Sequence, residues 1–149
     1  MNNLLKDVKL TKLQIIKNLK GNILKYQIKK NFNNFGESYF SLIKAKKIKA
    51  WKKHLKQTQN LCVPLGKVKF ILFDDRVKSK TYGKFYSCIL AYPHNYKMLT
   101  IPPNIWYGFQ NLFKNTSIIA NITDLPHNKS ENKKLKLKNK LIPKNKIQF

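Results

Sequence analysis

Residues 48–76, IKAWKKHLKQTQNLCVPLGKVKFILFDDR, decide the fold class of this chain. Apolar and polar residues alternate within short runs, and turn-forming residues such as Gly66 separate the runs. This pattern is typical of β-strands that bury one face. A second part, residues 100–124, has the same character in TIPPNIWYGFQNL and SIIANITD. Strands with polar residues at inward positions are therefore expected in two separate parts of the chain.

Further strand-like runs lie on both sides of this stretch. They are ESYFSLI at 37–43, KFYSCILAY at 84–92 and KMLTIPP at 97–103. Several short strands with Gly, Pro or Asn between them indicate an all-β sandwich or barrel.

The N-terminal residues 8–30 are predicted to form a hairpin that turns at residues 18–22, NLKGN. A helix is the alternative, because the apolar residues also fit helical spacing. Residues 31–36 are expected to form a loop. We expect one domain in residues 1–128, followed by a lysine-rich tail in residues 129–149. The tail should be loosely ordered, with at most one helical turn or an edge strand.

Composition limits the classes of partner. The 149 residues suit one domain, and the formal net charge of +25 would ordinarily point to nucleic acid. However, Arg76 is the only arginine among 31 basic residues, and the lysines are spread along the whole chain. Because recognition of phosphates and bases commonly uses arginine, we expect no nucleic-acid partner. A basic nucleic-acid-binding protein is kept as an alternative.

The cysteines and the hydropathy pattern suggest a compartment. Cys62 and Cys88 lie in apolar runs and are expected to be buried thiols in a reducing environment. No segment approaches the roughly 20 apolar residues that span a bilayer, and the N-terminus is too polar for a signal peptide. We expect a soluble, cytoplasmic protein without a membrane partner.

Alternation places the side chains of Lys52 and His54 on one face of the strand predicted at residues 48–54. If this face is the interior of the barrel, His54 is a candidate general base near neutral pH. Lys52 would then favour the neutral form of His54 through charge repulsion. The alternative is that both residues face solvent in a lysine-rich strand.

Amides and charges mark two further candidate positions. Gln59 and Asn60 begin an apolar strand, where they could bind sugar hydroxyls or a base edge, or simply end the strand. Asp74 and Asp75 stand beside Arg76. The arginine could bind a diphosphate through two hydrogen bonds, with an aspartate orienting it, or form a structural salt bridge.

The late strands offer more candidates. Trp106 and Tyr107 are neighbours and must point to opposite faces, so one of them reaches the interior. Tyr107 is a candidate donor of a proton or hydrogen bond, whereas Trp106 fits core packing. Asn121 is a candidate pocket residue, and Asp124 could either reach the pocket or build a turn.

The sequence lacks the motifs of several other kinds of functional site. The sequence has no phosphate-cradling glycine loop, no CxxC pair and no GxSxG elbow. Its histidines, His54, His94 and His127, are far apart in the sequence. We therefore expect neither a metal site nor a cofactor.

Four of these segments, in this order, resemble the dTDP-4-dehydrorhamnose 3,5-epimerase family of cupin-like proteins over residues 35–127. They are IKAWKKH, QNLCVPLGKV, DDR followed by SKTYGKF, and IPPNIWYGF. The resemblance implies a cupin-like jelly roll that forms a homodimer and binds a nucleotide-diphosphate sugar inside each barrel.

The chain differs from the family at positions that carry its chemistry. Lys49 stands in place of an arginine, and Lys52 in place of the catalytic base histidine, with His54 two residues later. Tyr107 replaces a histidine, and the family's catalytic tyrosine on the late strand is missing near Ala120. The resemblance therefore implies an isomerase with altered catalytic residues.

The implied function is epimerisation or isomerisation of a dTDP-4-keto-6-deoxy sugar in surface polysaccharide biosynthesis. His54 is the expected base, and Tyr107 or Lys52 the expected donor. The expected substrate-binding residues are Lys49, Gln59, Asn60, Arg76, Asn121 and Asp124. The alternatives within this fold are a dTDP-sugar 3,4-ketoisomerase-like enzyme and a non-catalytic sugar-nucleotide-binding module.

Overall fold

The computed structural model describes residues 4–27 and 34–143, and these consist of β-strands, turns and one short 3₁₀ helix. The elements are β1 (Lys9–Lys12), β2 (Ile15–Ile16), β3 (Ile23–Leu24), β4 (Glu37–Ile43), β5 (Ile48–His54), β6 (Gln59–Leu65), β7 (Lys67–Asp74), β8 (Phe85–Ala91), β9 (Lys97–Ile101), β10 (Ile105–Asn111), β11 (Ser117–Thr123), η2 (Lys129–Glu131) and β12 (Asn132–Lys134). The all-β prediction is confirmed. Of the loop predicted at residues 31–36, residues 31–33 fall outside the described residues, and residues 34–36 belong to no helix or strand.

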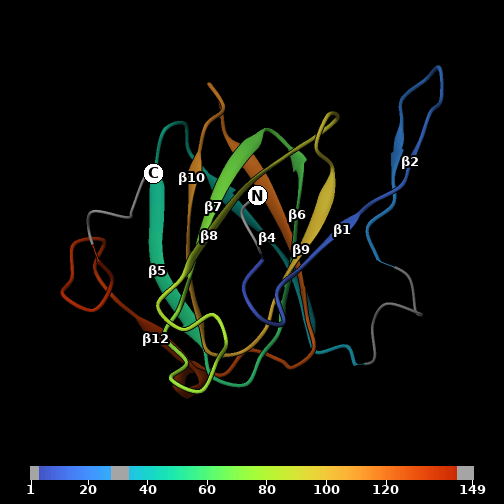
Figure 1. The fold of residues 1–149 in the computed structure, drawn as a ribbon. Coiled ribbons are helices and arrows are strands. Elements are labelled where there is room, and N and C mark those ends of the chain that lie inside the picture. The colour runs from blue at the N-terminus through green and yellow to red at the C-terminus, as the bar shows by residue number, and fades with distance from the viewer. Residues whose placement is uncertain (1–3, 28–33, 144–149) are drawn as a thin grey trace.

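Two five-stranded antiparallel sheets form the body of the protein. One has the order β1-β9-β6-β11-β4 and the other β12-β5-β10-β7-β8. Figure 1 shows the two sheets facing each other around a common interior, as in a jelly roll. Strand β4 lies at the edge of the first sheet, while β5 lies near the edge of the second, beside β12. The predicted cupin-like jelly roll is confirmed.

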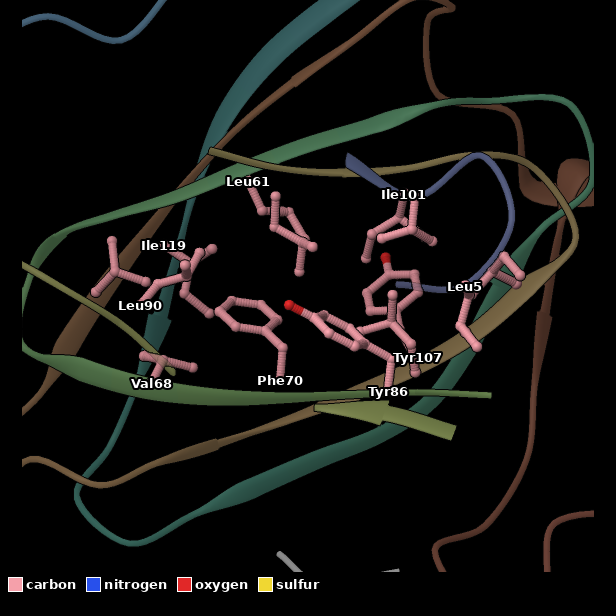
Figure 2. Close-up of a cluster of buried hydrophobic side chains, with 14 of the residues drawn as sticks. Leu5, Leu61, Val68, Phe70, Tyr86, Leu90, Ile101, Tyr107 and Ile119 are labelled. Atoms are coloured by element: carbon pink, nitrogen blue, oxygen red, sulfur yellow. The ribbon is translucent and has the colours of Figure 1, made fainter. Parts of the chain in front are cut away.

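The core fills the space between the sheets. Alternate apolar residues of each strand point inward, because successive side chains of a strand face opposite ways. Figure 2 shows Phe70, Tyr86 and Tyr107 of the second sheet packed towards Leu61 and Ile119 of the first, and all five are buried. The alternation that predicted the strands is thus the alternation that builds the core.

The hairpin predicted at residues 8–30 is confirmed only around its turn, because β1 pairs with β9 of the first sheet and residues 28–30 lie outside the described residues. Strands β2 and β3 pair antiparallel, with Ile15 opposite Leu24. At the base of the hairpin, Leu13 packs with Cys62 and Ala120 on the outer face of the first sheet. Figure 1 shows the hairpin extending away from the two sheets. The described residues of this segment therefore form strands and not the helix that was the alternative prediction.

The C-terminal segment covers the outer face of the second sheet. It contains the 3₁₀ helix η2 and the edge strand β12, the two kinds of element that the sequence left open. The backbone of Leu135 exchanges two hydrogen bonds with Trp51, at 2.9 and 3.1 Å. Ile142 is fully buried in a cluster with Trp51 and Trp106.

No helix among the described residues is long and apolar enough to cross a membrane.

Candidate active site

A cavity of about 450 Å³ opens between the two sheets, at the side where β4 faces β5 and β12. Its volume lies within the usual range for small-molecule sites. The lining residues come from both sheets and from the C-terminal segment: Tyr39, Ser41, Lys49, Ala50, Trp51, Lys52, Leu61, Tyr107, Phe109, Ile119, Asn121, Lys134 and Leu135.

A β-bulge in β5 brings two lysines to one wall of this cavity. In the ladder with β10, Lys52 pairs with Tyr107 and Lys49 pairs with Phe109. Two residues thus separate the partners on β5 but only one on β10, which is the geometry of a bulge. Lys49 and Lys52 consequently line the same cavity although they are three positions apart.

The wall is cationic. Lys52 is half-buried, and Lys134 joins it from β12, where the two residues are direct partners. Burial lowers the pKa of Lys52 below its ordinary value, and the nearby charge of Lys134 lowers it further. Among the described residues, no carboxylate lies within ion-pair distance of Lys52. An amine in this environment can be neutral at a lower pH than an ordinary lysine.

The opposite wall carries a chain of neutral polar groups. The Asn121 amide donates hydrogen bonds to the Tyr39 hydroxyl, at 2.8 Å, and to Gln59 Oε1, at 2.7 Å. Gln59 in turn donates to Gln57 Oε1 at 2.8 Å. Tyr39 and Asn121 line the cavity, whereas Gln59 is buried behind Asn121. These hydrogen bonds fix the positions of the Tyr39 hydroxyl and the Asn121 amide, two of the polar groups that line this wall.

His54 is buried and does not line the cavity. Its ring stacks on that of Tyr107, with centroids 6.2 Å apart, and its Nδ1 lies 2.7 Å from Glu131 Oε2. Burial lowers the pKa of His54, although the hydrogen bond to Glu131 opposes the shift. Its Nε2 is buried without a hydrogen-bond partner among the described residues. The pair His54–Glu131 therefore supports Tyr107 from outside the cavity.

Tyr107 is the cavity residue that the sequence predicted most directly. It is buried, lines the cavity and lies in the strand next to Lys52. Burial raises the pKa of its hydroxyl well above the ordinary value, so this group stays protonated. Trp106 faces the outer cluster, where its indole N–H donates to Asp75 at 2.8 Å.

Besides Gln59, three predicted substrate-binding residues lie outside the cavity lining and have structural partners. Arg76 binds Asp74 with two hydrogen bonds of 2.9 Å, which is the salt-bridge alternative of the sequence analysis. Asn60 points to the outer face and bonds Thr100 at 2.8 Å. Asp124 accepts a 2.7 Å hydrogen bond from the backbone of Thr58, as expected of a turn residue.

Sequence reasoning missed three residues at or near the site. Tyr39 lies in a strand whose sequence contains no motif that points to a site. Alternation does place it on one face with Ser41. Glu131 is the only acidic residue of the tail, and this rarity was an available signal. Lys134 gave no such signal in the sequence, since it is one of many lysines in the tail. Across residues 4–27 and 34–143, no three His, Cys, Asp or Glu side chains are grouped so that they could hold a metal ion.

A family model described as dTDP-4-dehydrorhamnose 3,5-epimerase matches residues 4–143, nearly the whole chain. The chain belongs to this family. A solved structure of a dTDP sugar isomerase from Desulfovibrio desulfuricans is 35% identical to this family member, with a TM-score of 0.91 over 93% of this chain and 90% of the other. The family predicted from the four segments is confirmed.

Two other similar proteins have lower identity to this chain. A dTDP-4-dehydrorhamnose 3,5-epimerase structure from Bacillus anthracis, solved with TDP and PPi bound, is 20% identical, with a TM-score of 0.80 over 91% of this chain and 82% of the other. At this identity it shows the shared epimerase-family fold. A probable low-salt glycan biosynthesis epimerase from Haloferax volcanii is 29% identical over 85 residues, which are 56% of this chain and 54% of that protein. The chain thus aligns with about half the length of this curated relative.

Proposed function

We propose that this family member is an isomerase that epimerises a dTDP-4-keto-6-deoxy sugar, bound in the cavity as a nucleotide-diphosphate sugar, for surface polysaccharide biosynthesis. One observation carries the proposal. The cavity holds Lys52, which has a lowered pKa and occupies the position where the family resemblance implies a catalytic base. Family membership over residues 4–143 supports the class of reaction.

Lys52 is the proposed base. Epimerisation next to a ketone begins when a base removes the proton from the neighbouring carbon. A neutral amine can accept this proton, and the lowered pKa of Lys52 increases the neutral fraction at a given pH. The sequence favoured His54 as the base, but His54 does not line the cavity. We therefore assign proton removal to Lys52 and a positioning role to His54.

Tyr107 is the proposed donor to the ketone oxygen. Negative charge develops on this oxygen when the proton leaves, and a hydrogen-bond donor stabilises it. Because the pKa of Tyr107 is raised by burial, its hydroxyl keeps its proton and can donate. Its place beside Lys52 in the ladder puts base and donor on the same wall.

The remaining polar groups of the cavity are proposed to bind the substrate. Lys49 and Lys134 offer cationic groups for the diphosphate, since an ammonium group binds phosphate as a point charge. Asn121 offers its amide to the sugar, and Gln59 holds that amide in place. The structural partners of Asn60, Arg76 and Asp124 account for those residues without a ligand.

The test is incorporation of deuterium from deuterated water into a dTDP-4-keto-6-deoxy sugar. Wild type should place deuterium on the carbons next to the ketone, and Lys52→Met should reduce the rate by roughly 100-fold or more. Lys133→Met is the matched control, since Lys133 lies on the same strand as Lys134 but does not line the cavity. If wild type takes up no deuterium, the proposed reaction is wrong. Thermal stabilisation by the ligand without any exchange would indicate the binding module instead.

We also propose a homodimer that forms through the outer face of β4. Phe40 and Leu42 on this face are 74% and 61% exposed. The neighbouring outward residues of β11, Ile118 and Ile122, are also apolar. These four side chains are uncharged, so two copies of a chain with net charge +25 would repel each other less here than at a lysine-rich surface.

Both cysteines are free thiols, which supports our proposal that the protein works in the cytoplasm.

A further inference from the structure

Tyr39 stands on a different wall of the cavity from the proposed base. Tyr39 belongs to β4 of the first sheet, whereas Lys52 belongs to β5 of the second, and both side chains line the cavity. A substrate held between the sheets would therefore present one face to each residue. Tyr107 shares the wall of Lys52, as the two are direct ladder partners.

The Tyr39 oxygen is held so that its proton is available. It accepts a 2.8 Å hydrogen bond from Asn121, and its own O–H has only a long contact, 3.5 Å, with Gln59 Oε1. Asn121 is fixed by a second bond to Gln59 and by a 3.0 Å bond that its Oδ1 accepts from the backbone of Asn60. A donor aimed at the phenolic oxygen stabilises the negative charge that remains after proton loss.

Inversion at a carbon needs proton removal from one face and proton delivery to the other. We propose that Tyr39 is the catalytic acid that delivers this second proton, an inference that rests on the proposed function. Lys52 takes the proton and becomes an ammonium, and the substrate becomes an enolate. The Tyr39 O–H bond then breaks as a C–H bond forms on the opposite face. Solvent afterwards returns a proton to the phenolate and removes one from Lys52.

This assignment separates two events that can be measured independently. Lys52 alone can remove a proton and return a solvent deuteron to the same face, which gives exchange without inversion. Inversion needs Tyr39 as well. The informative quantity is the ratio of inversion to exchange at the same carbon, and this ratio does not depend on the amount of folded protein.

The experiment compares Tyr39→Phe with wild type and with Tyr86→Phe in deuterated water. Tyr86 is a buried core tyrosine that does not line the cavity, so its variant is a matched control. Tyr39→Phe should still exchange deuterium with retention, while the ratio of inversion to exchange falls by about 100-fold or more. Tyr86→Phe should keep the wild-type ratio.

Two outcomes would overturn the assignment. One is a wild-type ratio in Tyr39→Phe, and the other is equal loss of exchange and inversion in a variant that still binds the nucleotide sugar. A second variant, Asn121→Ser, keeps the Tyr39 hydroxyl but shortens its hydrogen-bond donor, and should lower the ratio to a smaller extent. Failure of the proposed function looks different, because wild type itself would then show no exchange.

Discussion

The Asn121 amide and the Tyr39 hydroxyl are joined by a 2.8 Å hydrogen bond between residues that are direct partners in the β11–β4 ladder. The same amide also bonds Gln59. One buried side chain therefore links the edge strand β4 to the interior strands β11 and β6. This link has consequences for stability that can be measured apart from any activity.

Replacing Asn121 by alanine should destabilise the fold. The change leaves Gln59 Oε1 and the backbone N–H of Asn60 without their partner in a buried place. We expect the free energy of unfolding to fall by roughly 2–3 kcal/mol, measured by urea denaturation. Asn34→Ala, at an exposed position before β4, should change it by less than about 0.5 kcal/mol. Equal effects in the two variants would contradict the buried network.

Replacing Lys134 by methionine should change the pH dependence of the reaction. The charge of Lys134 lowers the pKa of Lys52, so its removal raises that pKa towards the ordinary lysine value. Because Lys52 must be neutral to act as base, the rising limb of kcat/KM against pH should move to higher pH. Lys133→Met removes the same charge from the neighbouring residue and should leave the limb in place. An unmoved limb in Lys134→Met would count against Lys52 as the base.

Asp74 should contribute stability except in strong acid. Burial would raise the pKa of Asp74, but hydrogen bonds from Arg76, Ser79 and Thr81 outweigh it and hold the pKa far below the ordinary 3.8. A depressed folded-state pKa gives stability that is present above the ordinary value and is lost as the pH falls towards the folded value. Asp74→Asn should therefore cost roughly 2–3 kcal/mol at neutral pH.

The cost of Asp74→Asn should shrink as urea titrations are repeated below pH 3.8. Asp7→Asn is the control, since Asp7 is the exposed second carboxylate near Arg76, at 3.4 Å. It should cost less than about 0.5 kcal/mol at any pH. A cost of Asp74→Asn that is constant with pH would show that the charge of Asp74 is not what stabilises this strand end.

Ile142 and Leu141 test whether the C-terminal segment is part of the folded core. Ile142 is fully buried beside Trp51, whereas Leu141 is about half exposed. Ile142→Ala should lower the free energy of unfolding by about 2–4 kcal/mol. Leu141→Ala should lower it by less than about 0.5 kcal/mol. Similar small losses in both variants would mean that the segment adds little to stability.

Charged residues on β4 should dissociate the proposed dimer. Phe40→Lys adds a desolvated charge at the centre of the exposed apolar face, so sedimentation velocity should show a monomer. Leu19→Lys, at the exposed tip of the hairpin, should leave the oligomeric state unchanged. A wild-type protein that already sediments as a monomer would exclude the dimer.

Much of the fold was predictable because it depends on alternation with a period of two. The segments ESYFSLI and IKAWKKH have, as β4 and β5, the bounds that their sequence pattern indicated. The face of Tyr107 also followed, since a strand has only two faces and Trp106 takes the other.

The site was less predictable because it depends on pairing between distant segments. Alternation from Lys52 puts Lys49 on the opposite face, and only the bulge against β10 brings it back. The contact of His54 with Glu131 joins residues 77 positions apart, and no local pattern signals it. Asn60 and Gln59 looked equivalent in the sequence, yet adjacent residues of a strand must face different surroundings.

The bulge in β5 also bears on how relatives of this protein should be aligned. Here the two wall lysines, Lys49 and Lys52, are separated by two residues. A relative whose strand is one residue shorter would need no bulge, and the same two cations would then be separated by a single residue. A one-residue gap at this point should therefore preserve the ligand-facing charge. An alignment without this gap would be wrong at one of the two positions. It would match Lys49 or Lys52 to a residue of the relative that lies on the other face of the sheet.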